Sequence, residues 1–346
     1  MGLMTAIDLP SWSEALPCPW SAGWELVRQQ ALPREGMDGR PLGGFSAAAY
    51  SAGDDRLWLL SDAPQAYLLP VLGLKPWIRR GVPARIGRRL VLRGTDGTPL
   101  PASMDGEGLV VQGDQAWIVS EARGPRDRPA QLLRVSLRDG RLLQRQGLPA
   151  SWRSTATTGL ARNQGPESLT LQSDASLLTA AEAPLRQHQA HGGVARVPVA
   201  ALTPQQSWTA LGHLAIGPAG GAAARFQGLT ELLALDGPSG VLALHRSFPA
   251  TGQWTARLSL HSAPPQLKPL TGWDLLALGL PSDNWEGLAW GPRLPDGRRT
   301  LVAVSDDNFN PLQRNWVAVL APRQVPPLAD PSARPQQCIP AEVLSD

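Results

Sequence analysis

The stretch Gly106–Glu121, GEGLVVQGDQAWIVSE, contains an apolar strand, a short turn and a second apolar strand that ends in an acidic residue. The same pattern occurs four more times, as FSAAAYSAGDDRLWLLSD (45–62), PESLTLQSDASLLTAAE (166–182), GLTELLALDGPSGVLALHR (228–246) and WEGLAWGPRLPDGRRTLVAVSDD (285–307). Aligned on their hydrophobic positions, the copies have as equivalent residues Ser46, Glu107, Glu167, Thr230 and Glu286. A repeat of about 60 residues predicts one four-stranded blade of a β-propeller per copy.

Two further strand-like runs follow the second, third and fourth copies and would complete each blade. These runs are QLLRVSL (131–137) and RLLQRQG (141–147), GVARVPV (193–199) and SWTALGHL (207–214), and WTARLSL (254–260) and QLKPL (266–270). Helical periodicity is nearly absent. We expect a single all-β domain over 1–346, a propeller of about five four-stranded blades with room for a degenerate sixth.

The repeat region covers about 40–322, between an N-terminal segment (1–40) and a Pro-rich C-terminal tail (323–346). Within the N-terminal segment, WELVRQQAL (24–32) is expected to complete the last blade beside NWVAVLAP (315–322). Such closure removes exposed sheet edges. It would also bring the two cysteines, Cys18 and Cys338, close together, whether or not they form a disulfide.

Composition agrees with many short strands joined by turns, since the chain has 35 Gly, 34 Pro and 13 Trp but only 18% charged residues. The matched Trp58 and Trp117 are expected to fill space between blades. A net charge of +3 with scattered basic residues argues against nucleic-acid binding. Because no apolar run is long enough to span a membrane and no export signal opens the sequence, we expect a cytoplasmic protein, as a monomer.

The first strands of a propeller line its channel, so their equivalent residues should meet near the axis. Three of the five are glutamates, namely Glu107, Glu167 and Glu286. Carboxylates gathered this closely repel one another unless a cation or basic groups compensate. We expect a hard divalent cation with oxygen ligands, Ca²⁺ above all. The alternative is that each glutamate only accepts backbone hydrogen bonds from a neighbouring blade.

A second ring is expected where the second strands end, at the same end of the channel. The alignment assigns to it Asp62, Glu121, Glu182, His245 and Asp306. The metal ligands predicted from both rings are Asp62, Glu107, Glu121, Glu167, Glu182, Glu286 and Asp306. Further oxygen ligands are expected from Asp105, Asn163, Asp283, Asn284 and Asp307. Arg162, Arg246 and His245 are the candidates for binding an anionic substrate at this rim.

Four segments of the chain resemble the phytase-like propeller family described by an "esterase-like activity of phytase". They are GGFSAAAYSAGDDRLWLLSD, MDGEGLVVQGDQAWIVSEA, NQGPESLTLQSDASLLTAAEAPL and DNWEGLAWGPRLPDGRRTLVAVSDDNF, within about 40–322. In this match, the glutamates of the family's Glu-Gly pairs correspond to Glu107, Glu167 and Glu286. The family's closing Ser-Asp-Asp-Asn motif corresponds to Asp306, Asp307 and Asn308, with the serine before them. The chain departs from the family at Ser46-Ala47, at Glu167-Ser168 and at His245. The resemblance leaves a periplasmic or secreted location open.

The resemblance implies hydrolysis of a phosphoester or another ester. The leading hypothesis is a metal-assisted hydrolase for a small anionic or ester substrate, with Glu107, Glu167 and Glu286 as catalytic residues. Two alternatives remain open, a non-catalytic propeller that binds a ligand or a protein, and a propeller acting on a sugar lactone with the same cation.

Overall fold

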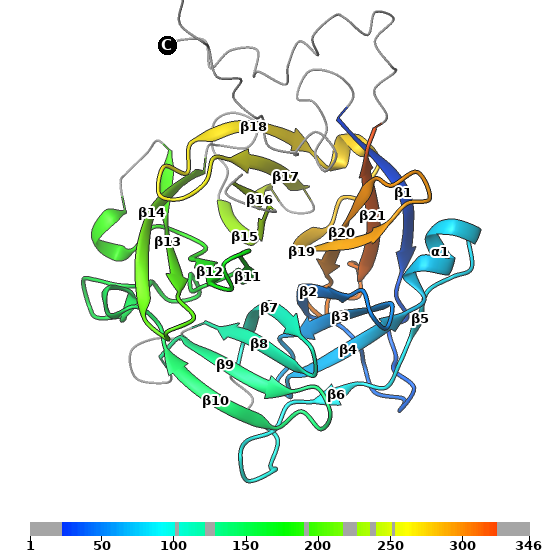
Figure 1. Ribbon diagram of the computed structural model, residues 1–346, viewed down its shortest axis with the longest axis horizontal. Helices are drawn as coiled ribbons and strands as arrows, with labels where there is room; N and C mark the ends of the chain where they lie inside the picture. Colours follow the sequence, from blue (N-terminus) through cyan, green and yellow to red (C-terminus); the bar gives the residue numbers. More distant parts are fainter. Residues whose placement is uncertain are drawn as a thin grey trace, which may run out of the picture.

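The computed structural model describes residues 23–100, 104–121, 129–189, 194–216, 227–235, 240–250 and 253–323. Strands account for 54% of the protein and helices for 6%, so the all-β expectation is confirmed. Five sheets stand around a central axis as the blades of a propeller, and the first strand of each lies innermost (Figure 1). No helix in these described ranges is long and apolar enough to cross a membrane.

The blades follow one another along the chain. Blade 1 contains β2 (Phe45–Ser51), β3 (Arg56–Ser61), β4 (Tyr67–Leu72), β5 (Arg85–Ile86) and β6 (Leu90–Val91). Blade 2 contains β7 (Gly106–Gln112), β8 (Gln115–Ser120), β9 (Gln131–Ser136) and β10 (Leu142–Gly147). Blade 3 contains β11 (Thr170–Leu171), β12 (Leu177–Ala180), β13 (Ala195–Leu202) and β14 (Trp208–Ile216). Blade 4 contains β15 (Gln227–Ala234), β16 (Val241–Ala250), β17 (Gln253–His261) and β18 (Pro269–Asp274).

Blade 5 joins the two ends of the described chain. Its three inner strands are β19 (Asn284–Arg293), β20 (Arg299–Asp306) and β21 (Trp316–Pro322), and its outer strand is β1 (Trp24–Ala31). β1 pairs antiparallel with β21, from Trp24 opposite Pro322 to Ala31 opposite Trp316. The predicted closure is confirmed. Both cysteines lie outside the described residues.

Apolar side chains fill the spaces between neighbouring blades. Trp58 of β3 is 4% exposed and packs in one cluster with Ile118 and Leu133 of blade 2. Trp117 of β8 packs with Leu177 and other residues of blade 3. Each blade therefore stabilises the next by burying apolar surface, and the two tryptophans have the packing role that the repeat predicts.

Two local features differ from the sequence expectation. The outer strand of blade 4 was expected at 266–270 but is β18, because a turn with positive φ at Leu267 precedes it. A short helix, α1 (Leu74–Arg80), follows β4 and packs Leu74, Trp77 and Ile78 into the core. Single-turn 3-10 segments occupy Ala150–Trp152, Arg186–His188 and Leu276–Leu278. None of these changes the arrangement of the blades.

Candidate functional site at one end of the channel

The innermost strands share an irregularity at the residue that the repeat aligns. In four blades the register with the second strand shifts by one residue there, so that this residue is the extra member of a β-bulge. The four are Ser46, Glu107, Thr230 and Glu286. In blade 3, Glu167 follows the isolated bridge between Pro166 and Ala181. Bulges re-aim a side chain, and here the re-aimed side chains come from all around the channel.

The hydroxyl side chains at this position join neighbouring blades. Ser46 Oγ donates to the carbonyl of Gly106, which directly precedes Glu107 in blade 2, at 2.5 Å. Thr230 Oγ1 makes the corresponding contact, at 3.5 Å, with the carbonyl of Trp285, which precedes Glu286 in blade 5. In the two blades where this position is Ser or Thr instead of Glu, the side chain therefore joins neighbouring blades by a hydrogen bond.

The Glu-Gly steps are explained by close approach of the next blade. A Cβ on Gly108 would lie 2.6 Å from the backbone of Ser168 and Leu169, and one on Gly287 would lie 3.1 Å from the backbone of Ala47. The first distance excludes a side chain, so Gly108 must be glycine, whereas at Gly287 a side chain would require the neighbouring backbone to shift. In blade 4 the residue equivalent to Gly108 is Glu231, whose Oε1 accepts the backbone N–H groups of Leu169 (3.2 Å) and Leu232 (3.0 Å).

The second ring is corrected in blade 4. In blade 1, Phe45 precedes Ser46 and pairs with Ser61, and the residue after Ser61 is Asp62. In blade 4, Leu229 precedes Thr230 and pairs with His245. The residue equivalent to Asp62 is therefore Arg246, and the alignment that placed His245 in the ring was one residue out of register. The ring comprises Asp62, Glu121, Glu182, Arg246 and Asp306.

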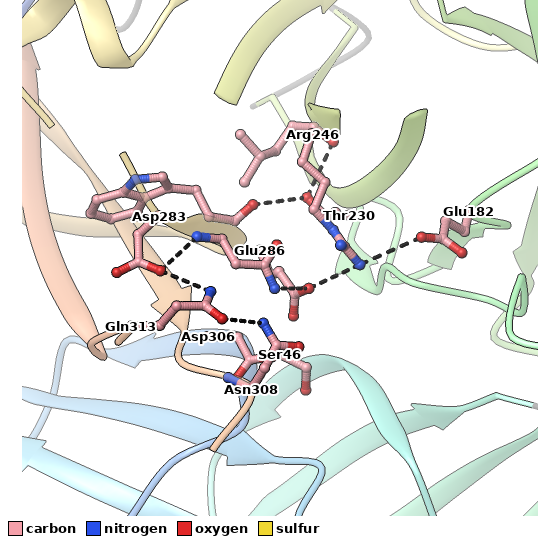
Figure 2. A network of polar contacts seen from close by, with 12 residues as sticks. Ser46, Glu182, Thr230, Arg246, Asp283, Glu286, Asp306, Asn308 and Gln313 are labelled. Atoms are coloured by element: carbon pink, nitrogen blue, oxygen red, sulfur yellow. Dashed lines mark hydrogen bonds and ion pairs between the residues drawn. The ribbon is translucent and has the colours of Figure 1, made fainter. Parts of the chain in front are cut away.

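Arg246 supplies positive charge inside the acidic group. Its Nη2 lies 3.0 Å from Oε1 of Glu286 and 3.5 Å from Oε1 of Glu182, so it connects blades 3, 4 and 5 (Figure 2). Asn284 Nδ2 donates to the same Glu286 oxygen at 2.8 Å. The side chain of Arg246 is only 17% exposed, and those of Glu182 and Glu286 are 2% and 8% exposed. Such pairs are little screened by solvent.

The carboxylates hold protons more tightly than free side chains do. Burial, and then the charges of Glu167 and Asp62, raise the pKa of Glu107 well above its ordinary value. Burial raises the pKa of Glu286 as well, but Arg246 and Asn284 work against that rise. For Glu182, burial opposed by Arg246 raises the pKa to about 8. The site therefore contains carboxyl groups with different tendencies to ionise near neutral pH.

Burial also raises the pKa of Glu167, with Glu182 and Glu121 adding to the effect, and it raises that of Asp306. For Arg246, burial alone would lower the pKa, yet Glu286 and Glu182 outweigh it and raise it. Arg246 is thus a permanent cation within this group. We call the group formed by Arg246 and the seven acidic residues of the two rings, Asp62, Glu107, Glu121, Glu167, Glu182, Glu286 and Asp306, the carboxylate cluster.

Several rim residues are occupied in holding loops. Asp283 accepts the backbone N–H of Asn284 and Arg314 and the side-chain amide of Gln313. Asp307 accepts the N–H groups of Gly44 and Phe309. Glu121 accepts the N–H of Gly165 in blade 3 at 2.8 Å. Asp283 therefore holds a loop within blade 5, whereas Asp307 and Glu121 have the blade-joining role that the sequence offered as the alternative for the glutamates.

The loop after β20 carries backbone strain beside the cluster. Asn308 and Phe309 are consecutive non-glycine residues with φ of 48° and 51°. Asp306 Oδ1 accepts the N–H of Asn308 at 2.7 Å and so holds the first of them in place (Figure 2). Asp105, before Glu107, has a positive φ of 43° as well. Strain of this kind costs about 1 kcal/mol or more per residue and gathers where a site is pre-organised.

Two predicted substrate-binding residues lie elsewhere. His245 is 4% exposed, its Nε2 contacts Ser259 Oγ, and burial with the nearby His261 lowers its pKa to about 3. Arg162 is exposed in the turn closed by the bridge between Ala161 and Gln164, where Asn163 also lies. Of the three candidates, only Arg246 contacts the glutamates.

The cluster has the donor chemistry of a site for a hard cation. Its ligands are all oxygens, and Oε2 of Glu182, although buried, accepts no hydrogen bond from the described residues. Negative charge exceeds the single guanidinium. Within the described ranges, however, no three acidic, histidine or cysteine side chains are drawn together as a formed metal site. The donors fit a Ca²⁺ ion in type and charge, and binding one would require side chains to turn inward.

The fold and site define a five-bladed propeller with a buried carboxylate cluster at one end of its channel. The model of the phytase-like family, described as "Esterase-like activity of phytase", matches residues 40–309. The protein belongs to this family, as the repeat phrases indicated. No curated protein matches the chain.

Three solved structures match the chain at low identity. A thermostable family-43 glycoside hydrolase matches with 10% identity and a TM-score of 0.47, over 84% of this chain and 91% of its own. The endo-arabinase from Bacteroides thetaiotaomicron matches with 11% identity and a TM-score of 0.47, over 82% and 95%. A DUF4221 family member from Bacteroides vulgatus matches with 9% identity and a TM-score of 0.42, over 84% and 80%. These matches concern the course of the chain only.

Proposed function

We propose that the protein hydrolyses a phosphoester or another ester at the carboxylate cluster. The observation that carries the proposal is that Glu107 and Glu286, two carboxyl groups of the cluster, have different surroundings. Glu286 has a guanidinium and an amide beside it, whereas only acidic neighbours influence Glu107 electrostatically. Groups whose environments push their pKa values apart are suited to work as base and acid in one reaction. The family description points the same way.

In this mechanism Glu286, where Arg246 and Asn284 oppose the rise in pKa that burial causes, accepts a proton from a water molecule as that water attacks the phosphoryl or carbonyl centre. Glu107, protonated because of its raised pKa, donates a proton to the oxygen of the leaving alcohol. The products are the acid and the alcohol, and one molecule of water is consumed. Arg246 stabilises negative charge that develops on the oxygens of the reacting group.

A divalent cation is part of the proposal, and the oxygen donors of the cluster favour Ca²⁺. Glu167, Glu182 and Asp306 would hold it, while Glu107 and Glu286 act as acid and base. When bound, it would polarise the phosphoryl or carbonyl oxygen next to the atom under attack and neutralise the carboxylates around it. Asp62 and Glu121 lie in the same ring and would complete the negative field.

The test is an assay of purified protein on 4-nitrophenyl phosphate, 4-nitrophenyl acetate and a sugar lactone, with Ca²⁺ or with chelator. We expect calcium-dependent turnover of at least one of the first two, lost in Glu286→Gln. Turnover of the lactone alone would favour the lactonase alternative. Absence of turnover of all three would favour the non-catalytic alternative.

A further inference from the structure

Blade 1 differs from the other blades in its outer strand. β5 and β6 are two-residue pieces that pair with opposite ends of β4, whereas β10, β14 and β18 contain 6, 9 and 6 residues. Pro70, in the middle of β4, has no N–H, and its carbonyl accepts the N–H of Gly87 at 2.7 Å, on the outer side. The missing donor therefore faces the outer strand, which is interrupted there.

A cleft of about 710 Å³ opens over this interruption. Its walls come from the loop 36–42, from β3 and β4, from the segment 87–91 and from the turn after β9. The volume is typical of a site for a small organic molecule. Met37, Leu72 and Leu90 contribute apolar surface. The cleft is lined by residues of β4 and β6, which lie towards the outside of the ring, whereas the innermost strands that carry the glutamates surround the axis (Figure 1).

Arginine dominates the polar lining of the cleft. The lining arginines are Arg40, Arg56, Arg88, Arg89 and Arg138, against the single acidic residue Asp38. Two of them have partners outside the lining, since Arg56 pairs with Asp54 at 3.2 Å and Arg138 pairs with Asp114 at 2.7 Å. Positive charge remains in excess even when these two pairs are set aside.

One arginine is fixed in position. Arg89 has a side chain only 12% exposed, and its guanidinium lies 4.7 Å from the ring centre of Tyr67. Its Nη2 donates to Asp38 and to the carbonyls of Arg40 and Pro41, at 2.9 to 3.1 Å. All of its hydrogen bonds to described residues use this one nitrogen. A guanidinium held in this way loses little conformational entropy when it binds a ligand.

We propose that this arginine cleft binds a small organic anion carrying two or more phosphate groups, at a site separate from the carboxylate cluster. Planar guanidinium groups bind phosphate through paired hydrogen bonds, and several arginines from separate segments suit several phosphates. The apolar surface of β4 and β6 accommodates the organic part of the molecule. Without a bound cation, the carboxylates at the axis repel such a ligand, whereas the outer cleft attracts it.

The test is calorimetric titration of the full-length protein with ADP, pyrophosphate and adenosine, at low salt and with chelator present. The chelator prevents a metal from bridging phosphate to the carboxylates. We expect both phosphate compounds to bind, ADP more tightly, and adenosine not to bind. Arg88→Ala and Arg40→Ala, both at exposed positions, should each weaken ADP binding about tenfold, the effect of one charge-assisted hydrogen bond.

The matched control is Arg145→Ala, an exposed arginine on the outer strand β10 of blade 2, which should leave ADP binding unchanged. A second control, Arg246→Gln, should also leave it unchanged because Arg246 belongs to the carboxylate cluster. Absence of binding, equal binding by all variants, or loss of binding only in Arg246→Gln would overturn the proposal. Comparison of melting temperatures shows whether each variant is folded.

Discussion

The same position of the innermost strand is used in two ways around the propeller. Ser46 and Thr230 place a hydroxyl there and bond to a carbonyl of the next blade. Glu107 and Glu286 place a carboxyl group there, and their raised pKa values reflect burial, opposed at Glu286 by Arg246 and Asn284. The hydroxyls thus stabilise the ring of blades. Burial of the carboxyl groups costs stability, and we propose that these groups serve the reaction.

This difference teaches that repetition alone does not assign function. A residue type recurring at one point of a repeat can be a packing device or a functional group. Contacts separate the two, because a residue that satisfies a neighbouring backbone group has a structural task already. Buried carboxylates without such a task are candidates for function.

The largest effect is expected for activity. Glu107→Gln removes the proposed acid while keeping the size of the side chain, and it should lower hydrolysis by at least about 100-fold. It should not lower the melting temperature at pH 8, because it removes a carboxyl group surrounded by others. Ser46→Ala at the equivalent position is the matched control and should retain most activity. Equal losses in both variants would contradict the division between the two positions.

A pH-dependent loss of stability is expected when Arg246 is replaced. Arg246→Met leaves Glu182 and Glu286 without their cation, so at pH 8 in chelator it should cost about 3–5 kcal/mol of unfolding free energy. Near pH 5 the cost should be much smaller. Carboxyl groups whose folded pKa is raised bind more protons in the folded state, so their stabilising effect is present below about pH 4.5 and declines as pH rises towards 8.

Urea unfolding of this variant and of the wild type at pH 5 and pH 8 measures the difference. A cost that is independent of pH would mean that Arg246 acts through packing and not through its charge.

Removal of one hydrogen bond between neighbouring blades should have an intermediate effect on stability. Ser46→Ala leaves the carbonyl of Gly106 without its partner in a buried position, which costs about 1–3 kcal/mol. Thr230→Val should cost less, because its contacts with carbonyl oxygens are long, at 3.4 and 3.5 Å. Denaturant unfolding measures both values. The reverse order would show that these hydroxyls do not hold neighbouring blades together.

The smallest effect is expected at Glu231, one residue beyond the bulge in β15. Burial raises its pKa well above the ordinary value, and its Oε1 accepts two backbone N–H groups. Glu231→Gln keeps those acceptors and should change stability by less than about 1 kcal/mol. Glu231→Leu removes them and should cost more. A large effect of Gln on both stability and activity would instead place Glu231 among the ionised groups of the site.

Much of this arrangement could be predicted from the repeat. Its period gave the blades, and the apolar runs gave most strands and the closure of β1 on β21. The equivalence of Glu107 and Glu286 followed from the same alignment. The bulges themselves could not be predicted, because an extra residue in one strand leaves the hydrophobic alternation of the other strand unchanged.

The sequence alignment placed Arg246 at the rim of the channel but not in the second ring of residues. An arginine does not resemble the acidic residues around it, so the alignment preferred the preceding His245. Pairing of Leu229 with His245 corrects this by one residue. A sequence signal did exist, since Ser61 and Ser120 also precede the acidic residues of their blades and correspond to His245. The interrupted outer strand of blade 1 was not predicted, because the effect of Pro70 depends on which edge of β4 faces outward.

The central claim is that the carboxylates at the axis form one cation-dependent site. The most direct measurement is calorimetric titration of chelator-treated protein with Ca²⁺ at pH 8. We expect saturable binding by the wild type and by Ser46→Ala, with binding weakened at least about tenfold in Glu167→Gln and in Glu182→Gln, because an amide oxygen carries no charge. No measurable binding by the wild type, or equal binding by all four proteins, would contradict the account.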